Sequence, residues 1–489
     1  MSRGFFARSP CILRDCLMFQ FALFRVHHDC SINLEPFEMI LSIESVVLGI
    51  NLPPVSTKSR SNDNTTPAEY RPFIVMGTAF AYPDEDEPSH GRVLVVECCC
   101  GSYVSLKSDP QDQMARRVRQ VADLPLMGGI YSIAPFYGGN ILVTCGSDTI
   151  ICQLAASVLP GGGNDGEFGE LFLNRIGTGH HGHLISLFVK SLVSSDKSLQ
   201  KRREKKQLAI VGDLMRSISL IEYYPKHHVI EELASDFNTN FCTDVAMLTD
   251  NIYMGSEGHN NLFVLRYNPN ASTEQARCRL DTVGQYHLGE NVNKMIGGSL
   301  VLPSNNATAG GRGAGSTSGK PSSTDGSSPG LGGRRVDMTI GSQTLYGTVD
   351  GTIGSILGLG GKSYAFLSAL QRAMDAIVRP VGDLSRANYR AWRRDQARHI
   401  ACGFVDGDWI ETFLDLNRPT MERVVGEMNA DPRWSIRDDG KGFGDRDSVR
   451  QNLMDTDEGL GADPPTSSNA RTLSVEDVLG AVEELSLLH

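Results

Sequence analysis

The chain has 489 residues and a formal net charge of −11. This length holds about two to four domains of roughly 100–200 residues each, which excludes a peptide hormone and a small disulfide scaffold. The negative charge argues against a surface that coats nucleic acid or anionic membrane throughout, although a local basic patch is compatible with it. The 51 glycines against 3 tryptophans favour a turn-rich, mainly β chain with low-complexity inserts.

An apolar stretch near the start, at residues 16–26, contains Arg25. It is too short to span a bilayer, and no small-residue cleavage site follows it, so we expect no membrane segment and a soluble nuclear or cytoplasmic protein. The 11 cysteines are ordinary for an intracellular chain. The run Cys98, Cys99 and Cys100 has neither CxxC spacing nor histidine partners, and we interpret these residues as reduced thiols buried on a strand.

A recurring unit dominates the first 360 residues: an apolar run, a glycine with a few turn residues, and a second apolar run. It occurs at residues 73–82, 141–154, 208–224, 252–267 and 344–357, with glycines at Gly77, Gly146, Gly212, Gly255 and Gly347. Further β-type runs lie between the units, at residues 91–99 and 183–192. A hairpin repeated in this way is typical of four-stranded propeller blades with long loops. We therefore predict a mainly β fold, a partial seven-bladed WD40-like β-propeller; an ordinary β-sandwich is the alternative.

Three segments interrupt this pattern. Residues 304–335 carry Gly or Ser at 16 of 32 positions, so they predict a disordered insert. Residues 197–206 form a strongly basic run, which could touch phosphate but is more often a solvated hairpin tip. Residues 160–169 form a glycine-rich acidic loop.

Beyond Gly361 the apolar period changes from two to about 3.6. Residues 363–378 predict a helix that ends before Pro380 and carries one apolar face, formed by Phe366, Leu367, Leu370, Met374 and Ile377. Residues 418–428 and 475–487 predict two more helices, and Ser474 with Asp477 forms a capping box for the last one, whose apolar face is Val478, Leu479, Val482 and Leu485. The expected C-terminal helical domain is interrupted by a polar, mobile stretch at 438–470.

Motifs of known catalytic chemistry are missing from the sequence. Two GxGxxG matches, at residues 161–166 and 177–182, do not lie at a strand-to-helix turn, which a dinucleotide site requires. His180, His181 and His183 lack a carboxylate or thiol nearby at ligand spacing, so we interpret them as a polar hairpin tip. We expect no catalytic residue, no cofactor, no metal and no small-molecule substrate, and hence no enzyme.

Several long stretches carry a specific resemblance. They lie at residues 70–97, 208–225, 233–248, 253–265, 284–301, 345–356 and 403–425, and include GDLMRSISL and GFVDGDWIETFLDL. These stretches closely resemble the C-terminal third of the damage-specific DNA-binding protein 1 family, the adaptors of cullin-4 RING ubiquitin ligases. The resemblance covers about residues 34–489, with gaps at the inserts, and residues 1–33 match nothing.

The resemblance implies a domain organisation. Members of the family have three propellers and a C-terminal helical domain. Residues 34–361 would form most of the third propeller and residues 362–489 the helical domain. The first propeller, and the second one that docks cullin-4, would be missing, so the chain is either a fragment, a truncated gene model or a protein without ligase docking. An unclosed propeller leaves unpaired strand edges, and we expect the isolated chain to be unstable.

The resemblance also implies a partner-binding site. In the family, substrate receptors insert a helical or WD-repeat motif between the first and third propellers. The matching positions here are Ile185, Leu187, Phe188, Leu214, Arg216, Phe241, Thr243, Asn291, Asn293 and Val349. Phe241 stands where the family pattern has Trp, and Asn291 stands where it has an aromatic residue. Both changes shrink the apolar anchor and predict a weaker grip or a different set of receptors.

The function implied is a non-catalytic scaffold that presents substrate receptors to a cullin-4 ubiquitin ligase in the nucleus, with links to DNA-damage recognition and excision repair. It would contact damaged DNA indirectly, through a receptor. The alternative is an RNA-processing scaffold of the same superfamily, similar to the large subunit of the cleavage and polyadenylation specificity factor or to the splicing factor 3b propeller subunit.

Overall fold

The computed structural model describes residue 32 and residues 34–51, 69–99, 117–157, 169–192, 207–300, 340–394, 397–431 and 472–488. The expected disordered insert 304–335, the basic run 197–206, the polar stretch 438–470 and most of the loop 160–169 lie outside these residues. The chain divides into two compact units. The first comprises Met1–Ile296, Tyr346–Ile353 and Arg390–Gly403, and the second Gly297–Leu345, Gly354–Tyr389 and Phe404–His489. The expected domain boundary at 361/362 stays a prediction.

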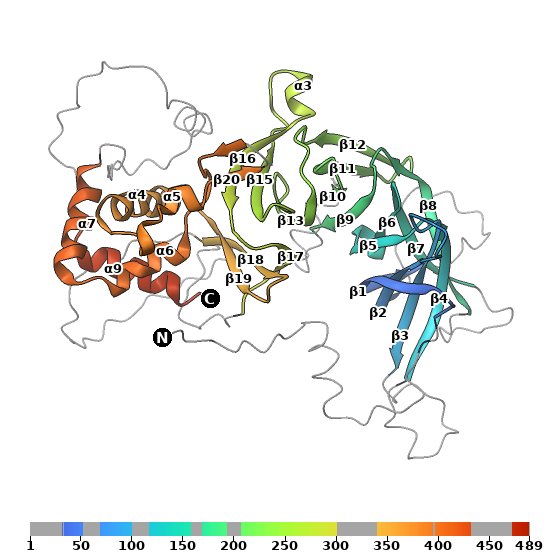
Figure 1. The fold of residues 1–489 in the computed structure, drawn as a ribbon. Coiled ribbons are helices and arrows are strands. Elements are labelled where there is room, and N and C mark those ends of the chain that lie inside the picture. The colour runs from blue at the N-terminus through green and yellow to red at the C-terminus, as the bar shows by residue number, and fades with distance from the viewer. Residues whose placement is uncertain are drawn as a thin grey trace, which may run out of the picture. The chain divides into compact units, whose positions relative to one another are not determined.

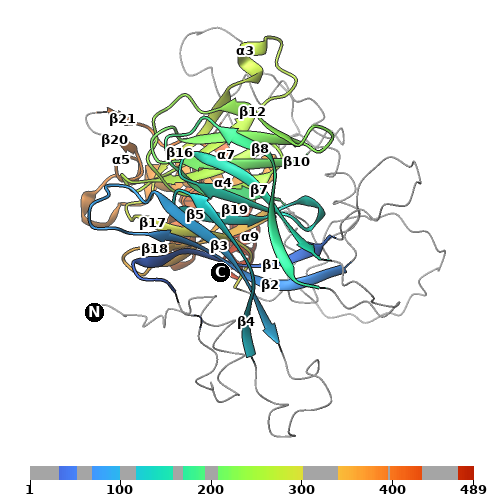
Figure 2. The same ribbon diagram turned by 90° about the vertical axis from the view of Figure 1, so that its right-hand side faces the viewer.

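Four antiparallel, four-stranded sheets make up most of the first unit. The first sheet contains β1 (Glu38–Ile50), β2 (Glu69–Phe80), β3 (His90–Cys99) and β4 (Arg117–Met127). The second contains β5 (Ile130–Pro135), β6 (Ile141–Cys145), β7 (Asp148–Ala156) and β8 (Leu171–His181), with the short helix η2 (Tyr137–Gly139) between its first two strands. Each strand pairs with the next one along the chain. In Figure 2, β3 and β4 extend together beyond the other strands of the first sheet.

The next two sheets repeat this order. The third contains β9 (Ser186–Ser191), β10 (Gln207–Asp213), β11 (Ile218–Tyr224) and β12 (Val229–Ser235). The fourth contains β13 (Cys242–Thr249), β14 (Ile252–Glu257), β15 (Asn261–Tyr267) and β16 (Leu280–His287), with the short helix α3 (Glu274–Arg277) before its last strand. A three-stranded sheet of β17 (Val292–Gly297), β18 (Ile340–Thr348) and β19 (Ile353–Leu359) follows, and the division between the units runs through it.

The sheets are arranged as successive propeller blades. Figure 1 shows the first four following one another in chain order. The first strands contact one another in turn, β1 with β5, β5 with β9 and β9 with β13, while the last strands β4, β8 and β12 contact each other at the opposite margin. First strands at an inner margin and last strands at an outer one are the arrangement of propeller blades. The expected partial β-propeller is confirmed.

Apolar clusters fill the space between neighbouring sheets. Val75 and Val143 belong to the cluster between the first and second sheets, Ile151 and Val211 to the next, and Ile210 packs among residues of the third and fourth sheets. The middle strands of these sheets have continuous apolar sequences because neighbouring sheets cover both of their faces. All five of these side chains are buried.

The first sheet also has an apolar face that points away from the second sheet. Met76, Leu94 and Val96 form a small cluster there, and Ile32 and Leu34 pack against it. Since side chains alternate along a strand, these residues lie opposite Val75, Val93 and Val95, which face the second sheet. The chain just before β1 therefore covers part of this outer face.

Four of the five expected hairpins are present and one expectation is wrong. Residues 141–154, 208–224, 252–267 and 344–357 each contain two paired strands. Residues 73–80, by contrast, lie within the single strand β2, with Gly77 in its interior. A Cβ at Gly77 would lie 2.5 Å from Ile130 Cγ2 and from Ser42 Oγ, so this glycine permits close packing of strands instead of a turn.

The segment Arg390–Gly403 adds two short strands to the fourth sheet region, β20 (Trp392–Arg394) and β21 (Ala397–His399). Cys402 exchanges two backbone hydrogen bonds with Gln285 of β16, at 2.8 and 2.9 Å. The buried Trp392 ring packs edge-on against Phe263, with ring centroids 6.4 Å apart. A segment that is distant in sequence thus completes the core of this sheet.

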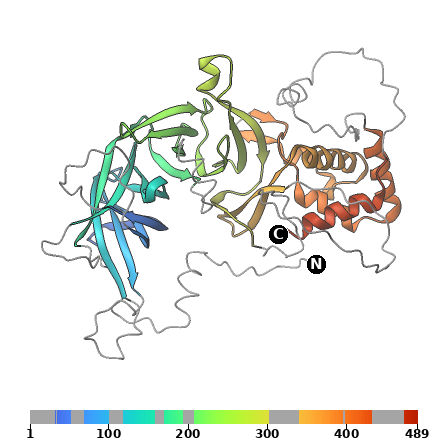
Figure 3. The same cartoon turned by 180° about the vertical axis from the view of Figure 1, so that it is seen from behind.

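The second unit contains the expected helices. They are α4 (Gly361–Ile377), α7 (Arg418–Ala430) and α9 (Val475–Ser486). The unit also contains the short elements η3 (Val381–Asp383), α5 (Arg386–Tyr389), α6 (Gly407–Glu411) and η4 (Thr412–Asp415). Figure 1 labels α4, α6, α7 and α9, which lie together, and Figure 3 shows the same group from behind. Phe366, Leu370, Met374, Val478 and Val482 are buried in one cluster, as expected. The capping box of Ser474 and Asp477 is confirmed. None of the helices in the described part of the chain is long and apolar enough to cross a membrane.

The expectation for the cysteine run is wrong where it can be examined. Cys98, near the end of β3, is exposed, because the strand pair extends beyond the packed part of the sheet there. Buried free cysteines occur elsewhere, at Cys145, Cys152 and Cys242. Burial raises the pKa of the Cys145 thiol to about 11 and that of the Cys152 thiol to about 12, so both are neutral core residues at pH 7.

A buried ion pair joins β1 to β3 across the first sheet. Arg92 donates two hydrogen bonds to Glu38, Nε to Oε1 and Nη2 to Oε2, both at 2.7 Å. Burial alone would raise the pKa of Glu38, but the hydrogen bonds from Arg92 and from the backbone outweigh it and hold this pKa at about 2. Because the folded pKa lies below the ordinary value of 4.5, the stabilisation is complete above pH 4.5 and is lost as the pH falls toward 2.

We expect the Glu38→Gln variant to lower the free energy of unfolding at pH 7 by about 2 kcal/mol, since it removes the closest of the carboxylates that pair with Arg92, while Glu35 and Asp123 remain at 3.4 and 3.9 Å. We also expect the variant to lose less stability than the parent chain between pH 4.5 and 2. Denaturant unfolding across this pH range measures both. Glu69→Gln is the control, because Glu69 forms a surface pair with Arg71 at 2.8 Å that contributes little. Equal effects of the two variants would contradict the prediction.

Candidate partner-binding edge and a histidine–glutamate cluster

The ten predicted site residues all belong to one edge of three consecutive sheets. Each first strand, β9, β13 or β17, begins at this edge, and the turn between the second and third strands of the same sheet lies beside that beginning. We call this surface the loop edge. Leu214 and Arg216 lie in the β10–β11 turn, Val349 lies in the β18–β19 turn, and the other seven lie at or just before the first strands: Ile185, Leu187, Phe188, Phe241, Thr243, Asn291 and Asn293.

Asp213 organises the loop edge in the third sheet. It is fully buried, and its carboxylate accepts backbone hydrogen bonds from Leu184 N at 2.6 Å, Met215 N at 2.8 Å and Arg216 N at 2.9 Å. Leu214 N donates to Ile185 O at 3.0 Å in the same region. One carboxylate therefore holds the β10–β11 turn against the segment that leads into β9.

Two further buried aspartates have similar roles. Asp236, just after β12, accepts hydrogen bonds from Ser217 Oγ at 2.7 Å and Asn240 Nδ2 at 3.2 Å. Asp244, in β13, accepts one from Met295 N in β17 at 2.6 Å. Carboxylates satisfy several backbone and side-chain donors at once, so they fix loops that cannot join a strand ladder.

The remaining positions are held within their own sheets. Gly258 N donates to Phe241 O at 3.0 Å, and Val349 N donates to Asn291 O at 2.9 Å. The hydroxyl oxygens of Thr243 and Ser256 share a hydrogen bond at 2.7 Å. The Thr243 hydroxyl thus already has a partner within its own sheet. The backbone of each turn is thereby fixed beside the first strand of its sheet.

Exposure separates these residues into anchors and packing residues. Val349 is 68% exposed and Phe241 38%, and Arg216 and Asn293 are also exposed. Phe188, in contrast, packs against the cluster between the third and fourth sheets, which makes it a core contact. The assignment of the ten residues to a partner stays a prediction.

The structure adds three exposed apolar residues to the loop edge. Leu184 is 55% exposed, Met215 44% and Phe237 66%, and the Arg279 guanidinium lies over the Phe237 ring at 5.9 Å. Apolar residues beside a turn aspartate were the available sequence signal. That signal does not distinguish an exposed side chain from a core one. The sequence analysis therefore did not find Leu184, Met215 and Phe237.

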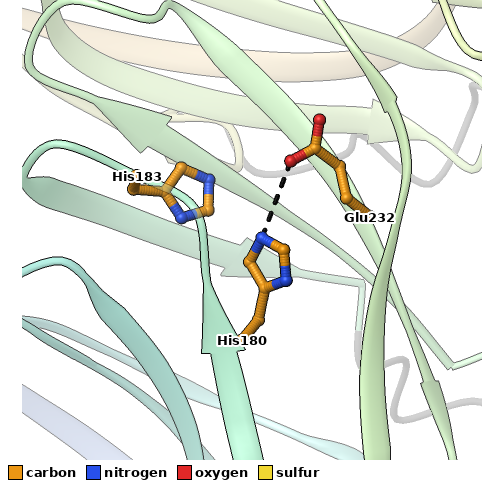
Figure 4. A group of neighbouring side chains, drawn as sticks. All are labelled: His180, His183 and Glu232. Carbon is orange, nitrogen blue, oxygen red and sulfur yellow. Dashed lines mark ion pairs between the residues drawn. The ribbon is translucent and has the colours of Figure 1, made fainter.

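A cluster of two histidines and one glutamate lies next to the loop edge, in the first unit. His180 is the second-to-last residue of β8, His183 lies in the connection to β9, and Glu232 is in β12 (Figure 4). His180 Nε2 and Glu232 Oε2 are 3.6 Å apart, and the ring centroids of His180 and His183 are 5.2 Å apart. The expectation that no carboxylate accompanies these histidines is wrong, because the packing of neighbouring sheets places β12, which carries Glu232, beside β8.

The surroundings of the cluster set the charge of its members. Burial, reinforced by the nearby His180, lowers the pKa of His183 to about 4, so this imidazole is neutral at pH 7. His180 lowers the pKa of the Glu232 carboxyl, which is therefore ionised. His181 points elsewhere: it pairs through Nδ1 with Asp148 and its side chain is 64% exposed.

Comparison with known proteins supports the resemblance found in the sequence. Residues 187–415 match the family model of the CPSF A subunit region. DNA damage-binding protein 1 of Oryza sativa subsp. japonica is 33% identical over 372 residues, which cover 76% of this chain and 27% of the rice protein. DNA damage-binding protein 1a of Arabidopsis thaliana and DNA damage-binding protein 1 of Solanum lycopersicum are each 32% identical over 359 residues, which cover 73% of this chain and 27% of either relative.

The resemblance to the DNA damage-binding protein 1 family is confirmed. The chain spans about a quarter of the length of the relatives that it matches. The family-model match begins at Leu187 in β9 and ends at Asp415 in η4, so it includes every loop-edge residue named above except Leu184 and Ile185.

We expect the Asp213→Asn variant to lower the free energy of unfolding by about 1–3 kcal/mol, because one amide oxygen cannot replace both carboxylate oxygens toward three backbone donors. Denaturant unfolding measures this. Amide hydrogen exchange at residues 184–185 and 214–216 is expected to increase in the variant. Asp350→Asn, at an exposed turn position, is the matched control. Unchanged exchange in these segments would contradict the role assigned to Asp213.

Proposed function

We propose that this chain is a non-catalytic propeller scaffold that docks substrate receptors of a cullin-4 RING ubiquitin ligase at the loop edge. The observation that carries the proposal is that residues from three sheets, chosen by sequence alone, belong to the same edge and include exposed apolar side chains. The position of these residues at the loop edge does not by itself identify a partner. The resemblance to DNA damage-binding protein 1 supports a substrate receptor as that partner.

The chemistry of the loop edge suits a helical or WD-repeat motif of a receptor. Phe241, Val349 and the newly found Leu184 and Met215 offer apolar anchors, which contribute most of the affinity once a partner excludes water from them. Arg216 and Asn293 offer directional hydrogen bonds at the rim. A scaffold of this kind raises the effective concentration of a substrate near the ligase and breaks no bond itself.

Other parts of the assembly would supply the remaining steps. In this proposal cullin-4 contacts propellers that precede this region in the relatives, and damaged DNA is contacted through a receptor. The net charge of −11 agrees with indirect contact, since proteins that neutralise phosphates need clustered cations. The proposed location is the nucleus, with a cytoplasmic pool.

Receptor binding is testable at the loop edge itself. We expect Arg216→Ala and Val349→Asp each to weaken the binding of a fluorescent helical peptide from a cullin-4 substrate receptor about tenfold. Phe241→Trp is expected to strengthen it, because the larger ring restores the anchor of the family pattern. Fluorescence anisotropy with the full chain gives the dissociation constants. Val47→Ala, which alters an exposed apolar residue of the first sheet, is the control and should bind like the parent chain.

A second candidate function is an RNA-processing scaffold of the same superfamily. The match to the CPSF A subunit region is the observation that favours it. Affinity purification of the tagged full chain from nuclear extract, followed by mass spectrometry, separates the two. Recovery of substrate receptors with the parent chain but not with Arg216→Ala supports the function as a ligase scaffold. Polyadenylation or splicing factors recovered equally with parent chain and Arg216→Ala would overturn it.

A further inference from the structure

The cluster of His180, His183 and Glu232 is not explained by partner docking. One ligand-type atom from each of the three residues lies within 4.8 Å of the other two. The residues come from three different segments: the last strand of the second sheet, the connection into β9, and the last strand of the third sheet. His180 and His183 lie three positions apart and Glu232 comes from a distant strand, and a close pair of ligands joined by a distant one is common in zinc sites.

His183 is the unusual member of the cluster. Its side chain belongs to a residue that is only 7% exposed, yet neither Nδ1 nor Nε2 has a hydrogen-bond partner among the described residues. His180 Nε2 is also buried without a hydrogen-bond partner in that part of the chain. Burying an imidazole with both nitrogens unsatisfied is costly, and histidines in protein cores ordinarily donate or accept at one of them. An electron-pair acceptor at this position would satisfy one of the two His183 nitrogens and His180 Nε2.

Gly182 leaves the space that the cluster needs. A Cβ at this position would lie 3.0 Å from His180 Nε2 and 4.0 Å from Glu232 Oε2. The backbone of Gly182 is also held in place, because the Arg216 guanidinium donates a hydrogen bond to its carbonyl oxygen. A side chain at position 182 would therefore crowd His180 Nε2 and approach Glu232 Oε2.

Two imidazoles and one carboxylate form a recognised ligand set for Zn²⁺, with metal–ligand distances of about 2.0–2.2 Å. Imidazole ligands select zinc, copper, nickel or iron over magnesium and calcium, which prefer oxygen. Tetrahedral ligands at these distances lie about 3.4 Å apart, so the ligand atoms, which lie within 4.8 Å of one another, would draw together by at most about 1.4 Å. Rotation about side-chain bonds supplies a movement of this size.

We propose that His180, His183 and Glu232 bind a divalent transition-metal ion, with Zn²⁺ the best fit, and that the fourth position is open to water or to a partner's side chain. The ion would join the outer strands β8 and β12 of neighbouring sheets and fix the connection that carries Leu184 and Ile185. This inference goes beyond the proposed function, because metal binding to the full chain is measurable without any receptor.

The test compares the full-length parent chain with three variants: His183→Asn, Glu232→Gln and the matched control His181→Ala. Each protein is stripped with a chelator and titrated with ZnCl₂ by calorimetry, and Co²⁺ replaces Zn²⁺ for visible absorption. We expect one more equivalent of Zn²⁺ in the parent chain and in His181→Ala than in the other two. The thiols are the same in all four proteins, so any zinc they bind cancels in the comparison. We expect affinity at this site to fall about 100-fold or more when a ligand is lost.

Two further measurements make the outcome decisive. Zn²⁺ is expected to raise the unfolding temperature of the parent chain and of His181→Ala, but not that of His183→Asn or Glu232→Gln. Circular dichroism of the stripped proteins establishes that the variants are folded, and Glu232→Gln preserves the shape of the side chain. The proposal is overturned if the parent chain and Glu232→Gln bind equal amounts of zinc. It is also overturned if His181→Ala loses the site, or if Co²⁺ gives no absorption that depends on His183.

Discussion

The packing of one twisted sheet on the next is the interaction on which the rest of the first unit depends. Each sheet alone has two apolar faces, and burying a Val or Ile side chain contributes about 1.5–3 kcal/mol. The clusters that contain Val143, Ile151 and Ile210 lie between neighbouring sheets, so no sheet completes its core by itself. Repeats that share cores in this way fold as a series, and the terminal faces need special cover. Ile32 and Leu34 supply part of that cover on the first sheet.

This packing also determines where partner-binding residues can lie. When first strands line the inner margin, their beginnings and the neighbouring turns collect on one edge of every sheet. Loops at such an edge have backbone groups that no strand ladder satisfies, and buried carboxylates satisfy some of them instead: Asp213 accepts from Leu184 N and Asp236 from Asn238 N. Asp244 accepts from Met295 N of the strand β17. The aspartates are structural, and the exposed side chains beside them are left available for recognition. The proposed metal would act in the same way at the outer margin, by fixing the connection between two sheets.

The sequence was a good guide wherever the signal is local. The helix with Phe366 and Leu370 on one face, the capping box at Ser474 and the hairpin around Gly146 each depend on residues a few positions apart, and all three are present. The sequence was a poor guide wherever distant strands decide the environment. Gly77 looks like a turn glycine but lies inside a strand, because Ile130 and Ser42 of other strands approach it closely. Cys98 continues an apolar run and is nevertheless exposed.

The sequence by itself determined the repeat, the helical ending and the family, because periodicity and long motifs are properties of neighbouring residues. Only the tertiary structure decided which of the predicted site residues face solvent, since Phe188 and Val349 are equally apolar and differ in what the adjacent sheet covers. Only the tertiary structure brought Glu232 to His180 and His183, because that meeting depends on two outer strands lying side by side. Strand pairing and sheet packing act between residues far apart in the chain, so a local pattern carries no record of them.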